Sequence, residues 1–155
     1  MLVVRAGLIR DISQPDEHAA GEPYAPEAPA QMFLYFMGNL VTVAHRGEWL
    51  ALAQGTAMMR DALLIPLMLA ENGVRKADGA KHLNRYLSRE QISALRSIPA
   101  VGSDPGQLLA AQESIAREYL TRARRLYDQT DQDRPTELEA AVRDLWRREL
   151  QIDLG

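Results

Sequence analysis

Apolar residues recur every three or four positions from residue 30 to residue 150, and this spacing predicts a succession of helices. Most of the boundaries coincide with helix start or stop signals. Gly47 and Gly73 follow the first two predicted helices, where glycine commonly ends a helix. Ser88–Gln91 has the sequence of a capping box, and Asp104 with Pro105 is typical of a helix start. The predicted helices cover residues 30–45, 48–72, 79–87, 88–98, 105–127 and 135–150.

The second predicted helix contains the most apolar part of the chain. Residues 62–70 are apolar almost all round, which is typical of a helix at the centre of a bundle. Pro66 lies inside this stretch and predicts a kink, because its ring removes one backbone hydrogen bond and collides with the carbonyl four residues earlier. Long helices joined by short loops predict an all-α protein, an up-and-down bundle of about five to six helices.

The chain before the bundle has a different composition. Residues 1–12 contain two short β-favouring runs around Gly7, which predict a strand or a small hairpin. A single hairpin is marginally stable in water, so we expect this segment to pair with something else. Residues 13–29 hold four prolines among small and acidic residues and predict an extended linker. Residues 30–155 then form the helical bundle domain.

Composition and charge remove several classes of function. The 155 residues include no cysteine and no His-x-x-x-His pair, so we expect neither disulfides nor a zinc site. Acidic residues outnumber basic ones by 21 to 18, which argues against a nucleic-acid partner. The longest apolar run, residues 62–70, is about half the roughly 20 residues that a membrane span needs. We therefore expect a cytoplasmic protein that binds no metal ion and enters no membrane.

Arg75 and His82 are separated by six residues, a spacing similar to the Arg-x₆-His signature of ribonucleases with the HEPN helical fold. In such a pair the histidine moves protons and the arginine steadies the phosphate, so both side chains must project together. Asp78 and Gly79 interrupt the helical pattern between them, which argues against a shared face. A ribonuclease that uses Arg75 and His82 is therefore an alternative hypothesis.

Several polar residues interrupt the apolar helical stretches. Asn39 lies within the first predicted helix, and Arg60 and Asp61 precede the most apolar part of the second. Polar groups buried in such surroundings need partners, so they either pair with one another or line a pocket between helices. Tyr35 and Trp49 each combine an apolar body with a polar tip and are candidate walls of that pocket. These five residues form the candidate substrate-binding set.

Charged residues on the predicted helix 105–127 indicate a solvated surface instead. Glu113 and Glu118 each lie four residues before an arginine, Arg117 and Arg122, which is the spacing of ion pairs on a helix face. We expect all four side chains to be exposed and to contribute little stability.

Five short segments follow one another in a characteristic order: Ala44–Trp49, Met59–Leu64, Asn72–Gly73, Gly79–Leu87 and Pro135–Leu138. This order resembles the C-terminal helical domain of small nucleotidyltransferases of the aminoglycoside and lincosamide adenylyltransferase type, over about residues 30–150. Residues 2–9 resemble the last strand of the catalytic domain in that family, although Arg5 stands where an acidic residue is expected.

The resemblance implies a bundle that binds the substrate and dimerises, while a separate catalytic domain holds magnesium and the nucleotide. The Gly-Ser turn and Asp-x-Asp strand of that catalytic domain have no counterpart here, so no catalytic residue and no cofactor are expected in this chain. The expected partners are a small-molecule substrate and either a second copy of the chain or a separate catalytic domain. Two other hypotheses stay open, a dimeric interaction bundle without a ligand and the HEPN-type ribonuclease.

Overall fold

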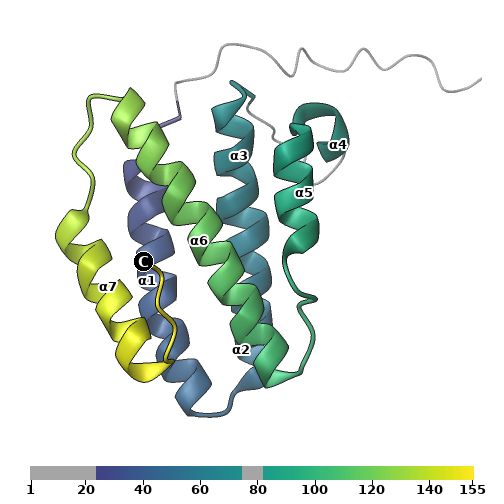
Figure 1. The fold of residues 1–155 in the computed structure, drawn as a ribbon, viewed down its shortest axis with the longest axis vertical. Coiled ribbons are helices and arrows are strands. Elements are labelled where there is room, and N and C mark those ends of the chain that lie inside the picture. The colour runs from purple at the N-terminus through teal and green to yellow at the C-terminus, as the bar shows by residue number, and fades with distance from the viewer. Residues whose placement is uncertain (1–23, 75–81) are drawn as a thin grey trace, which may run out of the picture.

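The computed structural model describes residues 24–74 and 82–155, and its helices form a bundle (Figure 1). Successive long helices run in alternating directions, α1 and α2–α3 first, then α5, α6 and α7. The segments α2, η1 (a π-helical segment) and α3 follow one another without a break and count as one helix. The described residues therefore hold six helices. They hold no strand, which confirms the predicted all-α bundle. The elements are α1 (Glu27–His45), α2 (Trp49–Met58), η1 (Met59–Leu64), α3 (Ile65–Glu71), α4 (Leu83–Tyr86), α5 (Arg89–Ser97), α6 (Pro105–Gln129) and α7 (Thr136–Glu149).

The first helix begins three residues before its predicted start. Pro26 takes the N-cap position, and its carbonyl oxygen accepts the backbone N–H of Ala30 at 2.9 Å. Pro29 fits into this first turn because a backbone N–H has no intrahelical partner there. The last residues of the predicted linker are therefore helical. The predicted strand or hairpin at residues 1–12 and the linker residues 13–23 lie outside the described residues.

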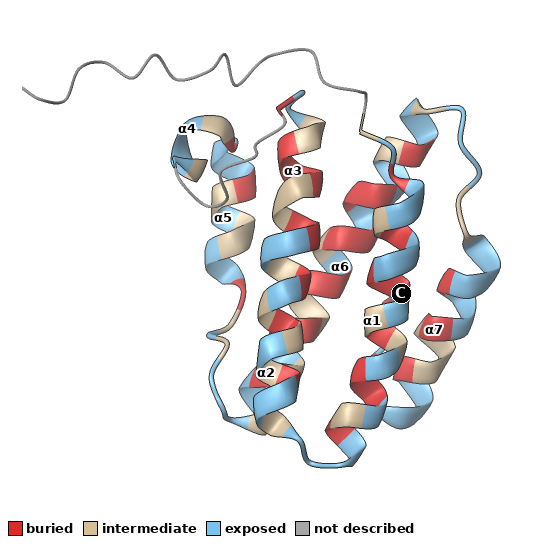
Figure 2. Ribbon diagram, turned by 180° about the vertical axis from the view of Figure 1, so that it is seen from behind, coloured by how far each residue is buried: buried red, intermediate tan, exposed pale blue. Residues whose placement is uncertain are grey.

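The core lies between α1, α2–α3 and α6, where Figure 2 shows the buried residues on the facing sides of the helices. Phe33 of α1 stacks on Tyr119 of α6, with ring centroids 3.7 Å apart and planes inclined by 4°. Trp146 fixes α7 to the same core, since its indole Nε1 donates a 2.8 Å hydrogen bond to the Met37 carbonyl oxygen. The apolar residues that recur at three- and four-residue spacing along α6 are buried, namely Leu108, Ala111, Ile115, Tyr119 and Ala123.

A π-helical segment, not a simple kink, precedes Pro66. The backbone N–H of Ile65 bonds the carbonyl oxygen of Arg60, five residues earlier, in place of the usual four. The wider turn relieves the collision that the proline ring would otherwise make with the carbonyl of Ala62. The helix therefore continues through Pro66, and the residues of η1 take positions that a regular α-helix would not give them.

Two helical glycines offer a matched test of how closely α1 and α2 pack. A Cβ at Gly38 would meet nothing within 4 Å, whereas a Cβ at Gly55 would lie 2.8 Å from Leu40 Cδ2. We expect Gly38→Ala to raise the free energy of unfolding by about 0.5–1 kcal/mol through helix propensity alone. Gly55→Ala gains the same propensity but crowds buried Leu40, so we expect it to be about 1 kcal/mol less stable than Gly38→Ala. Urea denaturation measures both, and equal stabilisation would contradict the close approach.

Candidate binding groove

A groove of about 750 Å³ lies between η1–α3 on one side and α4–α5 on the other. Most of its lining is apolar, and four charged or amide side chains join this lining. We call it the α3–α5 groove. It is lined by Tyr24, Arg60, Asp61, Ile65, Pro66, Leu69, Val74, Leu83, Asn84, Leu87, Ile92, Leu95 and Arg96.

Each wall of the groove is one stripe of a helix. Asp61, Ile65 and Leu69 follow one another at four-residue spacing and so share a face of η1–α3. Ile92 and Leu95 are three residues apart and share a face of α5. The apolar run of residues 62–70 predicted a helix at the centre of the bundle. One side of this helix, at Ile65, faces the groove and is only half-buried.

Arg60 and Asp61 form a bidentate ion pair in the groove lining. Arg60 Nε donates to Asp61 Oδ1 at 2.7 Å, and Arg60 Nη2 donates to Asp61 Oδ2 at 3.2 Å. The hydrogen bond to Asp61 raises the pKa of Arg60. The side chains are 33% and 55% exposed, so the pair contributes little stability and is open to a ligand.

Tyr24 places a phenol at the edge of the same groove. Burial raises the pKa of Tyr24 to about 12, so its hydroxyl is neutral at physiological pH. Among the described residues, the charges of the lining are two cations, Arg60 and Arg96, and one anion, Asp61.

The other three residues of the candidate set lie away from the groove. Tyr35 is 66% exposed on α1, and Trp49 packs half-buried against the core at the start of α2. Asn39 is exposed, so the expectation that it sits in buried surroundings is wrong. The structure thus brings Arg60 and Asp61 together in the groove, whereas a binding role for Tyr35, Asn39 and Trp49 stays a prediction from the sequence.

The candidate ribonuclease pair is only half described. His82 is exposed and has a left-handed backbone, with φ 58°, immediately before α4. Arg75 lies outside the described residues. The pairing of Arg75 with His82 therefore stays a hypothesis based on spacing.

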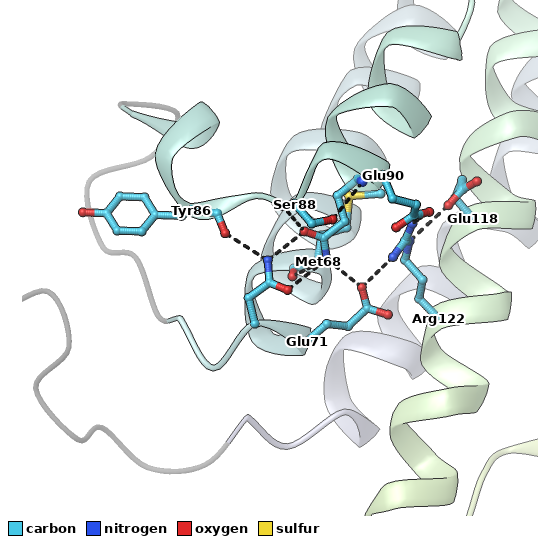
Figure 3. A network of polar contacts seen from close by, with 9 residues as sticks. Met68, Glu71, Tyr86, Ser88, Glu90, Glu118 and Arg122 are labelled. Carbon is cyan, nitrogen blue, oxygen red and sulfur yellow. Dashed lines mark hydrogen bonds and ion pairs between the residues drawn. The ribbon is translucent and has the colours of Figure 1, made fainter.

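A polar network that the sequence pattern does not reveal joins α5 to α3 and α6 (Figure 3). The Arg122 side chain is only 3% exposed and forms ion pairs with Glu71 and Glu90 at 2.6 Å and with Glu118 at 3.0 Å. The expectation that Arg122 lies on a solvated face is wrong. Burial opposes its charge, but hydrogen bonds to Glu71 and Glu90 outweigh this and raise its pKa. The signal was its position three residues after Tyr119, on the apolar stripe of α6.

Gln91 of α5 is the second centre of this network and is 2% exposed. Its amide Nε2 donates to the Met68 carbonyl oxygen and to Glu71 Oε2, both at 2.9 Å. Its Oε1 accepts from Asn72 Nδ2 at 2.7 Å and from the Ser88 backbone N–H at 2.9 Å. The predicted capping box is therefore confirmed, and the same glutamine also joins α5 to α3. Together Gln91 and Arg122 fix the wall of the groove that α5 provides.

Among residues 24–74 and 82–155, no three histidine, aspartate or glutamate side chains gather in a way that could hold a metal ion. None of the described helices has the length and apolar character needed to cross a membrane.

No family model matches this sequence, and no curated protein or solved structure shows significant similarity to it.

Proposed function

We propose that this chain is a non-catalytic binding domain that holds a small organic molecule in the α3–α5 groove. The groove itself is the observation that supports this proposal. Its volume of about 750 Å³ is that of a typical ligand site, and an apolar lining with a few polar groups is the usual composition. The substrate-binding role that the resemblance implies is the same kind of function.

The apolar lining also bears on the kind of ligand. Half-buried Ile65, Ile92 and Leu95 face the groove, and contact with an apolar group would remove them from water. A polyhydroxylated ligand would leave this surface poorly matched, whereas an amphiphile with an apolar body would cover it. Catalysis, magnesium and nucleotide binding are left to a separate catalytic domain, and homodimerisation is a further expectation of the resemblance.

Filling the groove tests the proposal. We expect N-phenylnaphthylamine, a neutral apolar dye, to bind the wild-type chain with increased fluorescence. Leu95→Trp places a larger side chain in the groove, so we expect dye affinity to fall about tenfold or more, equivalent to about 1.4 kcal/mol. The measurement is a fluorescence titration at constant protein concentration.

The matched control is Leu50→Trp, at an α2 position that is 80% exposed and does not line the groove. We expect this variant to bind the dye as the wild type does. Urea unfolding of both variants checks that each is folded. Equal dye binding by wild type and Leu95→Trp, or no dye binding at all, would overturn the proposed function.

A further inference from the structure

We propose that the α3–α5 groove is selective for small molecules that carry an apolar body and a single carboxylate. This inference rests on the proposed binding function and adds the chemical class of the ligand. The occupant is a free small molecule, held by Arg96 and Arg60 at its charged end and by the apolar lining along its body.

The charges of the described lining residues match one negative charge. Two arginines and one aspartate among these residues leave a net charge of +1, and the aspartate already shares the guanidinium of Arg60. A monoanion balances this charge. A dianionic phosphate would exceed it and would be repelled by Asp61.

Arg96 is the guanidinium available to a ligand. It lies in the last turn of α5, is exposed, and forms no ion pair or hydrogen bond with any residue that the structure describes. The planar guanidinium binds a carboxylate through two parallel hydrogen bonds, which a lysine could not do. Because Arg96 lies on the same helix as Ile92 and Leu95, α5 offers a charged contact and an apolar surface to the same amphiphilic ligand.

Arg60 supplies a second contact from the opposite wall. Its pairing with Asp61 is bidentate, but Asp61 is more than half exposed, so a ligand carboxylate can compete for the same donors. Asp61 then weakens the binding of anions by occupying Arg60 and by adding its own negative charge. Arg60 and Asp61 therefore have opposite effects on the affinity for anions. Loss of an arginine of the groove should weaken anion binding, whereas loss of the Asp61 charge should strengthen it.

The test compares naphthylacetate with naphthylacetamide, which have nearly the same shape and differ in charge. Both are titrated against the chain with bound N-phenylnaphthylamine, and dye displacement is followed by fluorescence. On the wild type we expect the carboxylate to displace the dye at a concentration about tenfold lower than the amide, the scale of one charge-assisted contact. We expect the preference to shrink in high salt, because the arginines are exposed.

Three variants assign this preference to residues. We expect Arg96→Gln to reduce the carboxylate preference severalfold, and Asp61→Asn to increase it. Arg89→Gln is the matched control, since Arg89 is an exposed arginine of the same helix that does not line the groove. Binding of the neutral dye and the carboxylate preference should both be unchanged in Arg89→Gln.

The outcomes separate this inference from the proposed function. Equal displacement by carboxylate and amide, or a preference that survives Arg96→Gln, would overturn the carboxylate selectivity while dye binding and its loss in Leu95→Trp keep the groove as a binding site. Failure of the dye to bind the wild type would overturn both proposals.

Discussion

Replacing Trp146 by alanine is expected to lower the free energy of unfolding by about 3–5 kcal/mol. The Trp146 side chain is fully buried and is the largest of the fully buried side chains in the described part of the molecule. Its removal leaves a cavity between α7 and α1 and also removes the hydrogen bond to the Met37 carbonyl oxygen. Domains of this size have a total stability of about 5–15 kcal/mol, so this one substitution removes a large share.

Urea denaturation followed by far-ultraviolet circular dichroism measures the loss without relying on tryptophan fluorescence. Trp146→Phe keeps most of the apolar volume but cannot donate to Met37, so we expect a loss between those of wild type and Trp146→Ala. Leu138→Ala is the control on the same helix, because Leu138 is 44% exposed, and we expect it to cost less than about 1 kcal/mol. A similar loss for Trp146→Ala and Leu138→Ala would contradict the anchoring role of Trp146.

The helices were predictable from the sequence because their signals are local. The stripe on α6 repeats at three and four residues, and the start of this helix carries Asp104, whose side chain accepts the backbone N–H of Gln107 at 2.8 Å. The capping box at Ser88 and Gln91 spans only four residues and was confirmed in the same way. Signals of this length do not depend on which helices meet in space.

The candidate site was predictable only in part. Arg60 and Asp61 were singled out because they interrupt an apolar run, and they do lie in the groove. Asn39 also interrupts such a run. However, Met37 and Val41 are four residues apart and share the inner face of α1, so Asn39, midway between them in the sequence, lies on the outer side. Residue spacing therefore distinguishes the inner from the outer face of a helix better than the polarity of neighbours does.

The α5 wall and its network could not be predicted from spacing alone. Arg122 meets Glu71, which is 51 residues earlier in the chain, and Glu90, which is 32 residues earlier. The pattern gives Arg122 a partner at Glu118, four residues away, and so indicates an ordinary surface pair. Its burial follows from the packing of α3 and α5 against α6, which depends on the tertiary structure.

Arg122 is the second residue at which a large effect is expected. Arg122→Met removes the cation and leaves three carboxylates close together, with Glu71 only 18% exposed. Loss of one partner of a buried pair typically costs about 3–5 kcal/mol, but Glu90 is 68% exposed and water screens part of its charge. We therefore expect Arg122→Met to lower the free energy of unfolding by about 2–3 kcal/mol in urea denaturation.

Two further variants distinguish the network from simple packing. Arg124→Met changes an arginine of the same helix that is 51% exposed, and we expect a loss below about 0.5 kcal/mol. Adding Glu71→Gln to Arg122→Met removes the most buried of the three carboxylate charges, so we expect the double variant to regain about 1 kcal/mol. A double variant that is less stable than Arg122→Met would show that the unpaired carboxylate is not the source of the loss.

The same substitution connects stability to the groove. Arg122 joins α6 to α3 and α5 through Glu71 and Glu90, so its loss should loosen α5 before the rest of the bundle. Amide hydrogen exchange in Arg122→Met is expected to accelerate more in α5 than in α1, whose buried residues do not depend on these ion pairs. Dye affinity in the groove should fall along with the protection of α5, because Ile92 and Leu95 form one of its walls. Uniform acceleration across α1 and α5, with dye affinity unchanged, would mean that Arg122 stabilises the bundle as a whole and does not position the groove.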